Sequence, residues 1–347
     1  MTPAAKSLHL GYNADELATS PYAAFFQPDL APLPAHVTEA ILVGGQAHEL
    51  FAGVEQAPEL MTSGDWPVET GYTIAPDGSM RIFVLTNMPR VTPAMWDWWF
   101  AWHGSEAQRY KLWHPRAHVD VRWSDGRSDL DHYIGRTSNV VEYVGAECLR
   151  LTIRFVHPAS LGIDEAKLRA NGEVAICARG GMEGTPMETG WLIHHVRPVP
   201  GGAQMRSRFW LGGSNVRPRG MPGVVGAGIG RTLSRLQPLT GNMAADLLVH
   251  CAQEMNHLAA ILPALYETFG SSNGFNNYRE ENVSTFYQCN PMKRPGDVQD
   301  IAEAVVYLAA PSGKFITGEL LNVEGGMLLW GEFWPAGKPD YFKVDPS

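Results

Sequence analysis

A long stretch with helical periodicity lies late in the chain, roughly at residues 243–268. It follows a series of short segments rich in β-branched and aromatic residues, several of which alternate between apolar and polar side chains. This order differs from the regular alternation of strands and helices in a doubly wound parallel sheet. Strands first and one long helix afterwards predict an α+β fold, in which antiparallel strands and the late helix form one body.

The expected strands follow one another at short intervals. A Pro-Asp-Gly turn at 76–78 joins the halves of one hairpin, and a Pro-Gly-Gly turn joins a later one. Strands are predicted over 117–123, 138–145, 149–156 and 173–181, with hairpins over 71–88 and 189–213. Helices are predicted over 91–110, 164–172 and the late stretch, where Pro263 is expected to kink or shorten the helix.

Strict alternation along the strand at 117–123 divides its side chains between two faces. His118 is then expected to share a face with the polar side chains at 120 and 122, while the apolar side chains at 119, 121 and 123 share the other. From a polar face, His118 can point into a cavity if the sheet curls around the late helix.

The composition limits which binding partners and which cellular compartment are expected. The chain has 347 residues and a formal net charge of −9, and its basic residues form no block, so a nucleic-acid partner is not expected. No apolar run approaches the ~18 residues of a membrane span, and the N-terminal residues lack the apolar core of a signal peptide. The four cysteines show no CxxC spacing, which favours reduced thiols in a cytoplasmic protein.

The late helix carries a row of side chains that can bind a metal ion. His250 and Glu254 are four residues apart and therefore neighbours on one helix face, with His257 close to the same row. An imidazole nitrogen beside a carboxylate oxygen suits Zn²⁺. A single His-x-x-x-Glu pair is more often a solvated pair than a metal site, but the apolar residues around this pair favour a buried face.

Two helix ligands require at least one further ligand from the strands. His118 is one candidate, and Glu142 is another because it lies in the apolar segment "NVVEYVG", where a carboxylate needs a partner. Glu147 competes with Glu142 but lies beside a turn, so Glu142 is preferred.

Four segments, in order, resemble one known family. They are "RYKLWHPRAHVDVRW", "IGRTSNVVEYVG", "HHVRPVPGGAQMRSRFWLG" and "HCAQEMNHLA", and they are similar to the 2,4-diacetylphloroglucinol hydrolases and phloretin hydrolases over roughly residues 60–268. The resemblance implies a helix-grip (Bet v 1-like) fold, a curved antiparallel sheet around a long C-terminal helix. It also implies a zinc-dependent enzyme that hydrolyses the carbon–carbon bond between an acyl group and a phenolic or enolisable ring carbon, in a retro-Claisen type of reaction.

The resemblance also implies roles for particular residues. The metal ligands that it implies are His118, Glu142, His250 and Glu254. Tyr110, eight residues before the strand histidine, matches a catalytic tyrosine, and His194 and His195 compete for the position of a catalytic histidine. Alternation places these two histidines on opposite faces, and His194 is preferred.

Two positions depart from the family pattern. The family has an asparagine three residues after the strand histidine, where this chain has Val121. It has a second tyrosine in the strand after the Gly-Gly turn, where the candidates here are Phe209 and Trp210. Both changes remove groups that would hold substrate hydroxyls, so the metal chemistry is expected to persist with a changed pattern of phenol recognition.

The C-terminal segment resembles a different family. "NPMKRPGDVQDIAEAVVYLAAPSGKFITGELLNVEGGM" (290–327) looks like the end of a short-chain dehydrogenase. The Gly-rich stretch "GVVGAGIGR" (223–231) follows a loop rather than a strand, so it is not expected to cradle a dinucleotide. The segment is predicted to be an appendage, and its usual place near subunit interfaces suggests a homodimer.

Three regions are therefore predicted: an irregular, partly helical N-terminal region at 1–68, a zinc hydrolase domain at 69–270, and a dehydrogenase-like segment at 285–335. The leading hypothesis is a zinc hydrolase of a small aromatic ketone or β-diketone. The alternatives are an NAD(P)-dependent short-chain oxidoreductase, supported by the tail alone, and a non-catalytic carrier of hydrophobic ligands.

Overall fold

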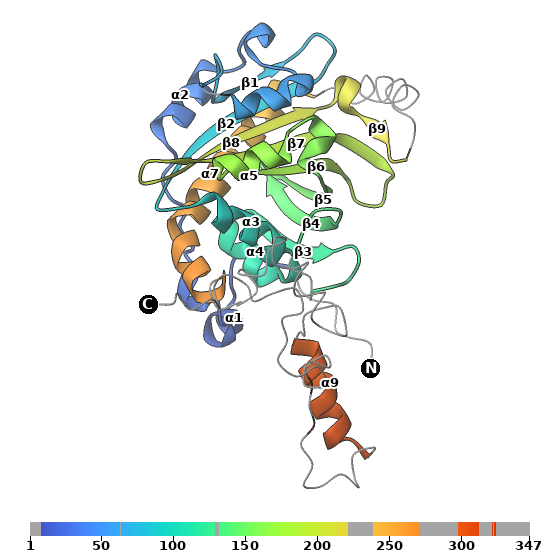
Figure 1. The fold of residues 1–347 in the computed structure, drawn as a ribbon. Helices are drawn as coiled ribbons and strands as arrows, with labels where there is room; N and C mark the ends of the chain where they lie inside the picture. The colour runs from blue at the N-terminus through green and yellow to red at the C-terminus, as the bar shows by residue number, and fades with distance from the viewer. Residues whose placement is uncertain are drawn as a thin grey trace, which may run out of the picture. The chain divides into compact units, whose positions relative to one another are not determined.

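The computed structural model describes residues 8–62, 64–128, 132–220, 239–270 and 298–311, together with residues 321 and 323. The chain divides into two compact units, residues 1–267 and residues 268–347. The first unit contains the sheet and the late helix (Figure 1).

A single antiparallel sheet forms the first unit. Its strands are β1 (Gly71–Ile74), β2 (Met80–Pro89), β3 (His118–Trp123), β4 (Thr137–Val144), β5 (Glu147–Val156), β6 (Val174–Met182), β7 (Met187–Val199), β8 (Gly202–Leu211) and the short β9 (Arg217–Pro218). They lie in the order β1-β2-β8-β7-β6-β5-β4-β3, and β9 pairs with β7. Both hairpins predicted from the turn sequences are present.

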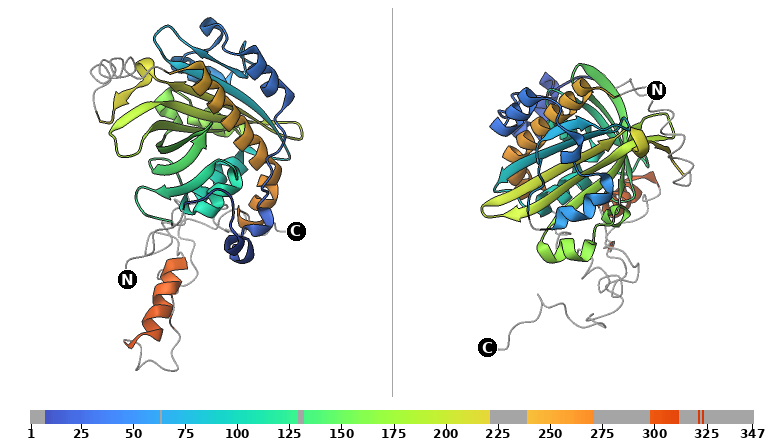
Figure 2. Two further views of the ribbon diagram at one scale, coloured as in Figure 1. Left: turned by 180° about the vertical axis from the view of Figure 1, so that it is seen from behind. Right: turned by 90° about the horizontal axis from the view of Figure 1, so that it is seen from above.

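The late helix is α7 (Gly241–Leu265), and it begins where the Thr240 side chain accepts a hydrogen bond from the Met243 amide. It packs against β1, β2 and β4, and the sheet curves around it (Figure 2). Pro263 lies inside its last turn, and a π-helical turn over Tyr266–Gly270 follows. The predicted α+β arrangement, a curved sheet gripping a long helix, is confirmed.

Two further helices share the face of the sheet that α7 covers, which we call the inner face. The sequence predicted one helix over 91–110, and the structure shows two, α3 (Pro93–Trp102) and α4 (Ala107–Trp113), separated by the 3-10 turn η4 (His103–Ser105). The break occurs at Gly104, where an added Cβ would lie 2.6 Å from the Trp123 ring of β3. The glycine therefore lets the chain turn closely over the sheet.

The predicted facing of the strand at 117–123 is wrong for His118. The pairing of β3 with β4 shifts by one residue between His118 and Asp120, because Val119 is the extra residue of a β-bulge. His118 lies opposite Glu142, and Val121 lies opposite Val140. The bulge therefore places His118 on the inner face together with Val121 and away from the charged side chains of the strand.

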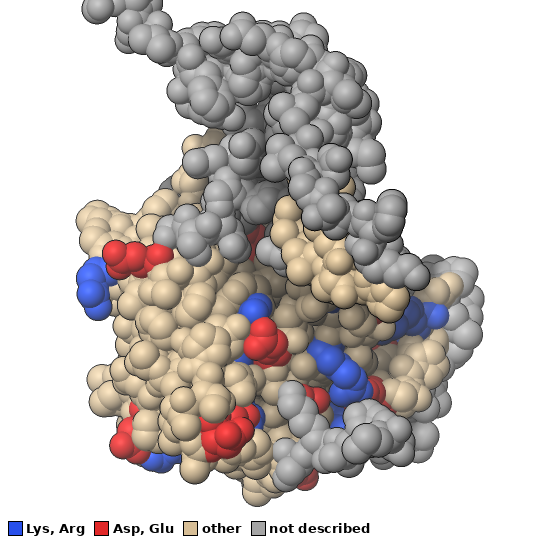
Figure 3. Space-filling view, turned by 90° about the horizontal axis from the view of Figure 1, so that it is seen from below, with Lys and Arg blue, Asp and Glu red and all other residues tan. Residues whose placement is uncertain are grey.

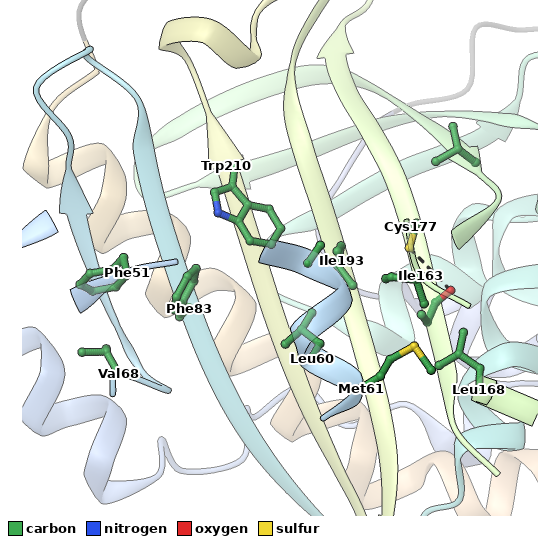
Figure 4. Close-up of a cluster of buried hydrophobic side chains, with 13 residues drawn as sticks. Phe51, Leu60, Met61, Val68, Phe83, Ile163, Leu168, Cys177, Ile193 and Trp210 are labelled. Atoms are coloured by element: carbon green, nitrogen blue, oxygen red, sulfur yellow. Dashed lines mark hydrogen bonds between the residues drawn. The ribbon is translucent and has the colours of Figure 1, made fainter. Parts of the chain in front are cut away.

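The opposite, outer face of the sheet is covered by residues from the N-terminal region and by α5 (Glu165–Asn171). An apolar cluster fills this interface, with Leu60 and Met61 of η3 (Val54–Met61) over Ile193 and Trp210 (Figure 4). The remaining N-terminal elements are α1 (Ala14–Thr19), α2 (Ala35–Val43) and the 3-10 turns η1 (Ala23–Phe25) and η2 (His48–Leu50); η5 (Pro158–Leu161) and η6 (Gly213–Asn215) lie later in the chain.

The helix described in the second unit is α9 (Val298–Ala309). It falls within the dehydrogenase-like segment at 290–327, whereas residues 312–320 of that segment lie outside the described residues, as does the Gly-rich stretch at 223–231. In the described part of the chain, no helix combines the length and the apolar character needed to cross a bilayer.

Candidate active site

Helix α7 presents two potential metal ligands to the inner face. His250 and Glu254 lie one helical turn apart, with His250 Nε2 3.8 Å from Glu254 Oε2. Both residues are buried although both are polar. A buried polar pair needs compensating partners, and the nearest of these come from the sheet.

Strands β3 and β4 bring His118 and Glu142 to the same place. His118 Nε2 lies 3.4 Å from Glu254 Oε2 and 3.8 Å from Glu142 Oε2. Donor atoms of His118, His250 and Glu254 all lie within 4.8 Å of one another, so these three side chains can contact a common ion. Glu142 borders this cluster through His118, whereas Glu147 lies exposed at the start of β5.

The His118 ring is held so that one nitrogen is left free. Its Nδ1 lies 3.0 Å from the Tyr110 carbonyl oxygen, to which it donates, and the Tyr110 ring stacks on it at 3.8 Å between centroids. The Nε2 atom is buried and has no hydrogen-bond partner among the residues that the structure describes. A histidine that donates from one ring nitrogen to a carbonyl and keeps the other free is the arrangement of a metal-binding histidine. The donor set of two imidazoles and a carboxylate, with a second carboxylate beside it, therefore fits Zn²⁺.

The two carboxyl groups of the site lack lysine and arginine partners in the described part of the chain. Burial raises the pKa of Glu142 to about 7, and burial together with the charge of Glu142 raises the pKa of Glu254 well above its usual value. The Tyr110 hydroxyl donates a hydrogen bond to Glu142. Burial lowers the pKa of His250 to about 4 and also lowers the pKa of His118. A bound cation would reverse the carboxyl shifts, because it favours the charged form.

The two competing histidines of β7 face opposite sides of the sheet. His194 is on the inner face, where its ring stacks on Phe100 of α3 and meets Phe209 edge-on. His195 is on the outer face, where its Nε2 lies 3.0 Å from Glu173 Oε2. Burial lowers the pKa of His194 to about 3, so the ring is neutral near neutral pH. His194 is therefore the one of the two that shares a face with His118, His250 and Glu254.

The departures from the family pattern also fall on identifiable faces. Val121 is buried on the inner face, two residues from the bulge that orients His118. Phe209 contacts His194 on the inner face, whereas the Trp210 indole nitrogen donates to the Ala52 carbonyl on the outer face. Of the two residues considered for the missing tyrosine, Phe209 is the one that lines the inner side.

The Trp-rich helix α3 contributes mostly to the packed interior. Trp96 and Trp99 are fully buried, and Trp98 stacks on Trp102 at 4.8 Å. His103 and His114 lie around the metal cluster and not in it: His114 stacks on His250 at 5.1 Å, and His103 stacks on Tyr110 at 6.0 Å.

Trp113 of α4 is a residue of the site that the sequence did not single out. Its ring meets His118 edge-on at 5.4 Å, and its buried indole nitrogen has no hydrogen-bond partner. His257, at the edge of the same row on α7, is buried and accepts from the Ala31 amide at 3.4 Å. The sequence signal for Trp113 was its place between Tyr110 and His118, within one of the family segments.

On the face shown in Figure 3, acidic and basic side chains are interspersed over a largely uncharged surface.

Comparison with known proteins separates the two parts of the chain. A family model described as the DAPG hydrolase PhiG domain matches residues 51–267. A 2,4-diacetylphloroglucinol hydrolase from Pseudomonas sp is 30% identical over 274 residues, which cover 75% of this chain and 92% of that protein. A phloretin hydrolase from Eubacterium ramulus is 30% identical over 263 residues, which cover 71% of this chain and 89% of that protein.

The C-terminal part matches other proteins over a short span. A model described as enoyl-(acyl carrier protein) reductase matches residues 243–328. A glucose 1-dehydrogenase from Gluconobacter oxydans is 51% identical over 43 residues, which cover 12% of this chain and 16% of that protein. The tail therefore corresponds to a small fraction of a dehydrogenase.

Two solved structures align with about half of the chain at low similarity. Protein CV1439 from Chromobacterium violaceum covers 53% of this chain and 97% of its own, at 12% identity and a TM-score of 0.28. Ara h 8.0201 covers 50% of this chain and 99% of its own, at 11% identity and a TM-score of 0.27. With the family model matching more than half of its residues and the Pseudomonas relative covered almost in full, the chain belongs to the DAPG hydrolase family.

Proposed function

We propose that this protein is a zinc-dependent hydrolase that cleaves the carbon–carbon bond between an acyl group and a phenolic or enolisable ring carbon. The observation that supports this most is the buried cluster of His118, His250 and Glu254, in which His118 Nε2 has no hydrogen-bond partner. The relatives are named as hydrolases of 2,4-diacetylphloroglucinol and phloretin, which are both aromatic ketones.

Four residues would hold the ion: His118, His250 and Glu254 directly, with Glu142 as the fourth ligand from β4. Zn²⁺ in such a site supplies a Lewis acid for a carbonyl oxygen and lowers the pKa of a bound water. Tyr110 donates to Glu142, and its carbonyl oxygen fixes His118. Tyr110 therefore orients two ligands at once and also places a hydroxyl group beside the reacting oxygen atoms.

The reaction adds one water across the bond: the acyl carbon gains oxygen and leaves as a carboxylic acid, and the ring carbon gains hydrogen. The ring carbon can leave only after it is protonated, which turns the phenol into its keto tautomer and the substrate into a β-diketone. His194 is neutral and sits on the inner face, so it can accept a proton from an O–H group and return it to the ring carbon. Such proton transfer contributes on the order of 10²–10⁴-fold to the rate.

The aromatic side chains of the inner face suit an aromatic ring. Phe100 and Phe209 contact His194, and Trp113 contacts His118, so apolar aromatic surface lies beside both histidines. Val121 and Phe209 offer no hydrogen bonds there. We therefore expect a substrate with fewer ring hydroxyls than phloroglucinol derivatives carry, or one whose hydroxyl groups bind elsewhere.

Metal analysis and acid release test the proposal together. The protein purified with zinc should contain about one ion per chain and should release acetate from 2,4-diacetylphloroglucinol or the corresponding phenylpropionic acid from phloretin. His250→Ala and Glu254→Ala should each lose the metal and the activity while the circular dichroism spectrum is unchanged. Full activity in a metal-free Glu254→Ala protein would refute the assignment of the site.

We also place the enzyme in the cytoplasm, because the described cysteines are free thiols.

We expect a homodimer formed through the tail at 285–335, because α9 exposes Ile301, Val305 and Val306. Sedimentation of the whole chain and of a chain ending at 284 distinguishes a dimer that depends on the tail from a monomer. A nicotinamide-dependent activity is not proposed, because the dehydrogenase match spans 16% of the relative.

A further inference from the structure

A buried hydrogen bond joins the inner histidine of β7 to the neighbouring strand. His194 and Ser207 lie directly opposite each other on β7 and β8, and His194 Nδ1 is 2.8 Å from Ser207 Oγ. Ser207 is fully buried, so no bulk water competes for this bond.

Two aromatic side chains pack against the ring of His194, and Ser207 contacts one of its nitrogens. Phe100 stacks on it at 5.7 Å, and Phe209 meets it edge-on at 5.8 Å. Within the described residues, Ser207 is the hydrogen-bond partner of the ring, and it contacts Nδ1. The state of a neutral histidine is set by the bond that its non-reacting nitrogen makes. Ser207 is therefore in a position to decide which nitrogen carries the proton.

A serine hydroxyl has one proton to donate and two lone pairs that accept. When the Ser207 oxygen accepts from His194 Nδ1–H, Nε2 keeps its lone pair. We propose that Ser207 is a positioning residue that holds His194 in the Nδ1–H form. This inference rests on the proposed function for its chemistry and on the geometry of β7 and β8 for the hydrogen bond.

The Nδ1–H form gives His194 the lone pair that the reaction needs. His194 Nε2 takes the proton of a ring hydroxyl and becomes an imidazolium. The imidazolium then returns that proton to the ring carbon, which gives the β-diketone, and water attacks the acyl carbon of this diketone to break the carbon–carbon bond and release the ring as an enolate. Ser207 touches neither substrate nor metal, and it acts by keeping Nε2 unprotonated and aimed inward before the proton arrives.

Nitrogen NMR of histidine-labelled, zinc-loaded protein tests the tautomer without any assay of activity. The ¹⁵N signals of His194, assigned by their loss in His194→Gln, should show Nδ1 protonated and Nε2 bare. In Ser207→Ala, the signals should shift toward the other tautomer or toward a mixture. Ser138→Ala is the matched control, because it removes a buried hydroxyl without a hydrogen-bond partner from β4 and should leave the His194 signals unchanged. A His194 protonated on Nε2 in the wild type, or signals that Ser207→Ala leaves unmoved, would overturn the inference.

Kinetics with phloretin or 2,4-diacetylphloroglucinol give the second test. Ser207→Ala should lower kcat by about 10- to 100-fold with KM and zinc content near the wild-type values, and Ser207→Thr, which restores the hydroxyl, should recover most of kcat. Equal kcat in Ser207→Ala and wild type contradicts the inference alone. Wild-type protein that binds zinc and cleaves neither these ketones, nor acylphenols with fewer ring hydroxyl groups, nor alicyclic β-diketones contradicts the proposed function, while the NMR result still decides whether Ser207 controls His194.

Discussion

Acidic side chains on the two faces of the sheet differ in whether they have arginine partners. On the outer face, Glu69 is paired with Arg206 and Arg208, and Glu188 is paired with Arg154 and Arg179. The pKa of Glu69 and that of Glu188 are both lowered from 4.5, because these arginines and their hydrogen bonds outweigh the cost of burial.

On the inner face, Glu142 and Glu254 have histidines and a tyrosine as neighbours. The pKa values of both carboxyl groups are raised, because burial is not offset by a positive side chain. The outer acids thus have arginine partners that the chain supplies, whereas among the described residues the inner acids have none. This difference supports a metal site more strongly than the presence of histidines alone.

The largest expected effect is on catalysis, from an isosteric change on the inner face. Glu254→Gln keeps the shape of the side chain and removes its charge, so it should abolish zinc binding and hydrolysis. The metal-free protein should be no less stable than metal-free wild type, because a buried carboxyl group without a cation is replaced by a neutral amide. Metal analysis, acid release and denaturant unfolding in a chelator measure these effects. A large loss of stability in the metal-free variant would show that Glu254 has a structural partner.

The adjacent histidines of β7 give a second test of the difference between the two faces. His194→Gln should lower kcat on the order of 10²–10⁴-fold with zinc retained, because it removes the proton carrier of the inner face. His195→Gln on the outer face should stay within a few-fold of wild type, although it loses the bond to Glu173. Steady-state kinetics and metal content distinguish the two. Equal losses in both variants, or full activity in both, would contradict the assignment of the proton carrier to one face.

On the outer face, the expected effect is on stability. Glu69→Gln leaves two fully buried arginines without their anion, and breaking a buried ion pair on one side costs about 3–5 kcal/mol. The specific activity of the molecules that remain folded should be unchanged, since Glu69 lies on the face opposite the metal cluster. Urea unfolding followed by tryptophan fluorescence measures the loss. A change below about 1 kcal/mol, the range of exposed ion pairs, would show that the outer pairs are not essential partners.

The smallest expected effect is a difference in pH dependence in the metal-free protein. The pKa of Glu142 is raised from 4.5 to about 7, so its protonated form stabilises the fold, and this contribution is lost as the pH rises through that interval. Glu69 behaves in the opposite sense, because its lowered pKa makes its contribution present above the unfolded value and lost in acid.

Between about pH 5 and about pH 8, metal-free wild type should lose on the order of 1–3 kcal/mol of unfolding free energy relative to Glu142→Gln. Denaturant titrations of both proteins in a chelator at the two pH values provide the measurement. Parallel pH dependences for the two proteins would mean that Glu142 is charged in the folded protein without a metal ion.

The sequence predicted the order of strands and helices better than it predicted which side chains point to which face of the sheet. The order of strands, both hairpin turns and the late helix followed from periodicity and turn residues, because these signals are local. The break at Gly104 depends on a tryptophan nineteen positions later in β3, and no local pattern could have indicated that contact. The bulge at Val119 is likewise a property of the pairing between β3 and β4.

The candidate site was predicted in part for the same reason. His250 and Glu254 are recognisable because both lie on one helix. Alternation could show that His194 and His195 face opposite sides, but which side is inner depends on where α3 and α7 dock. Ser207 carries no signal of its own, since a serine in a strand is common and its partner is thirteen positions away.

The extra residue in β3 changes which side chains of the strand share a face. His118 lies opposite Glu142 and Asp120 lies opposite Val141, so deleting Val119 would give regular pairing and leave His118 on the inner face beside Glu142. The position of the imidazole is therefore set by its partner on β4, and the strand can lose a residue at this point without turning the histidine away from the carboxyl groups.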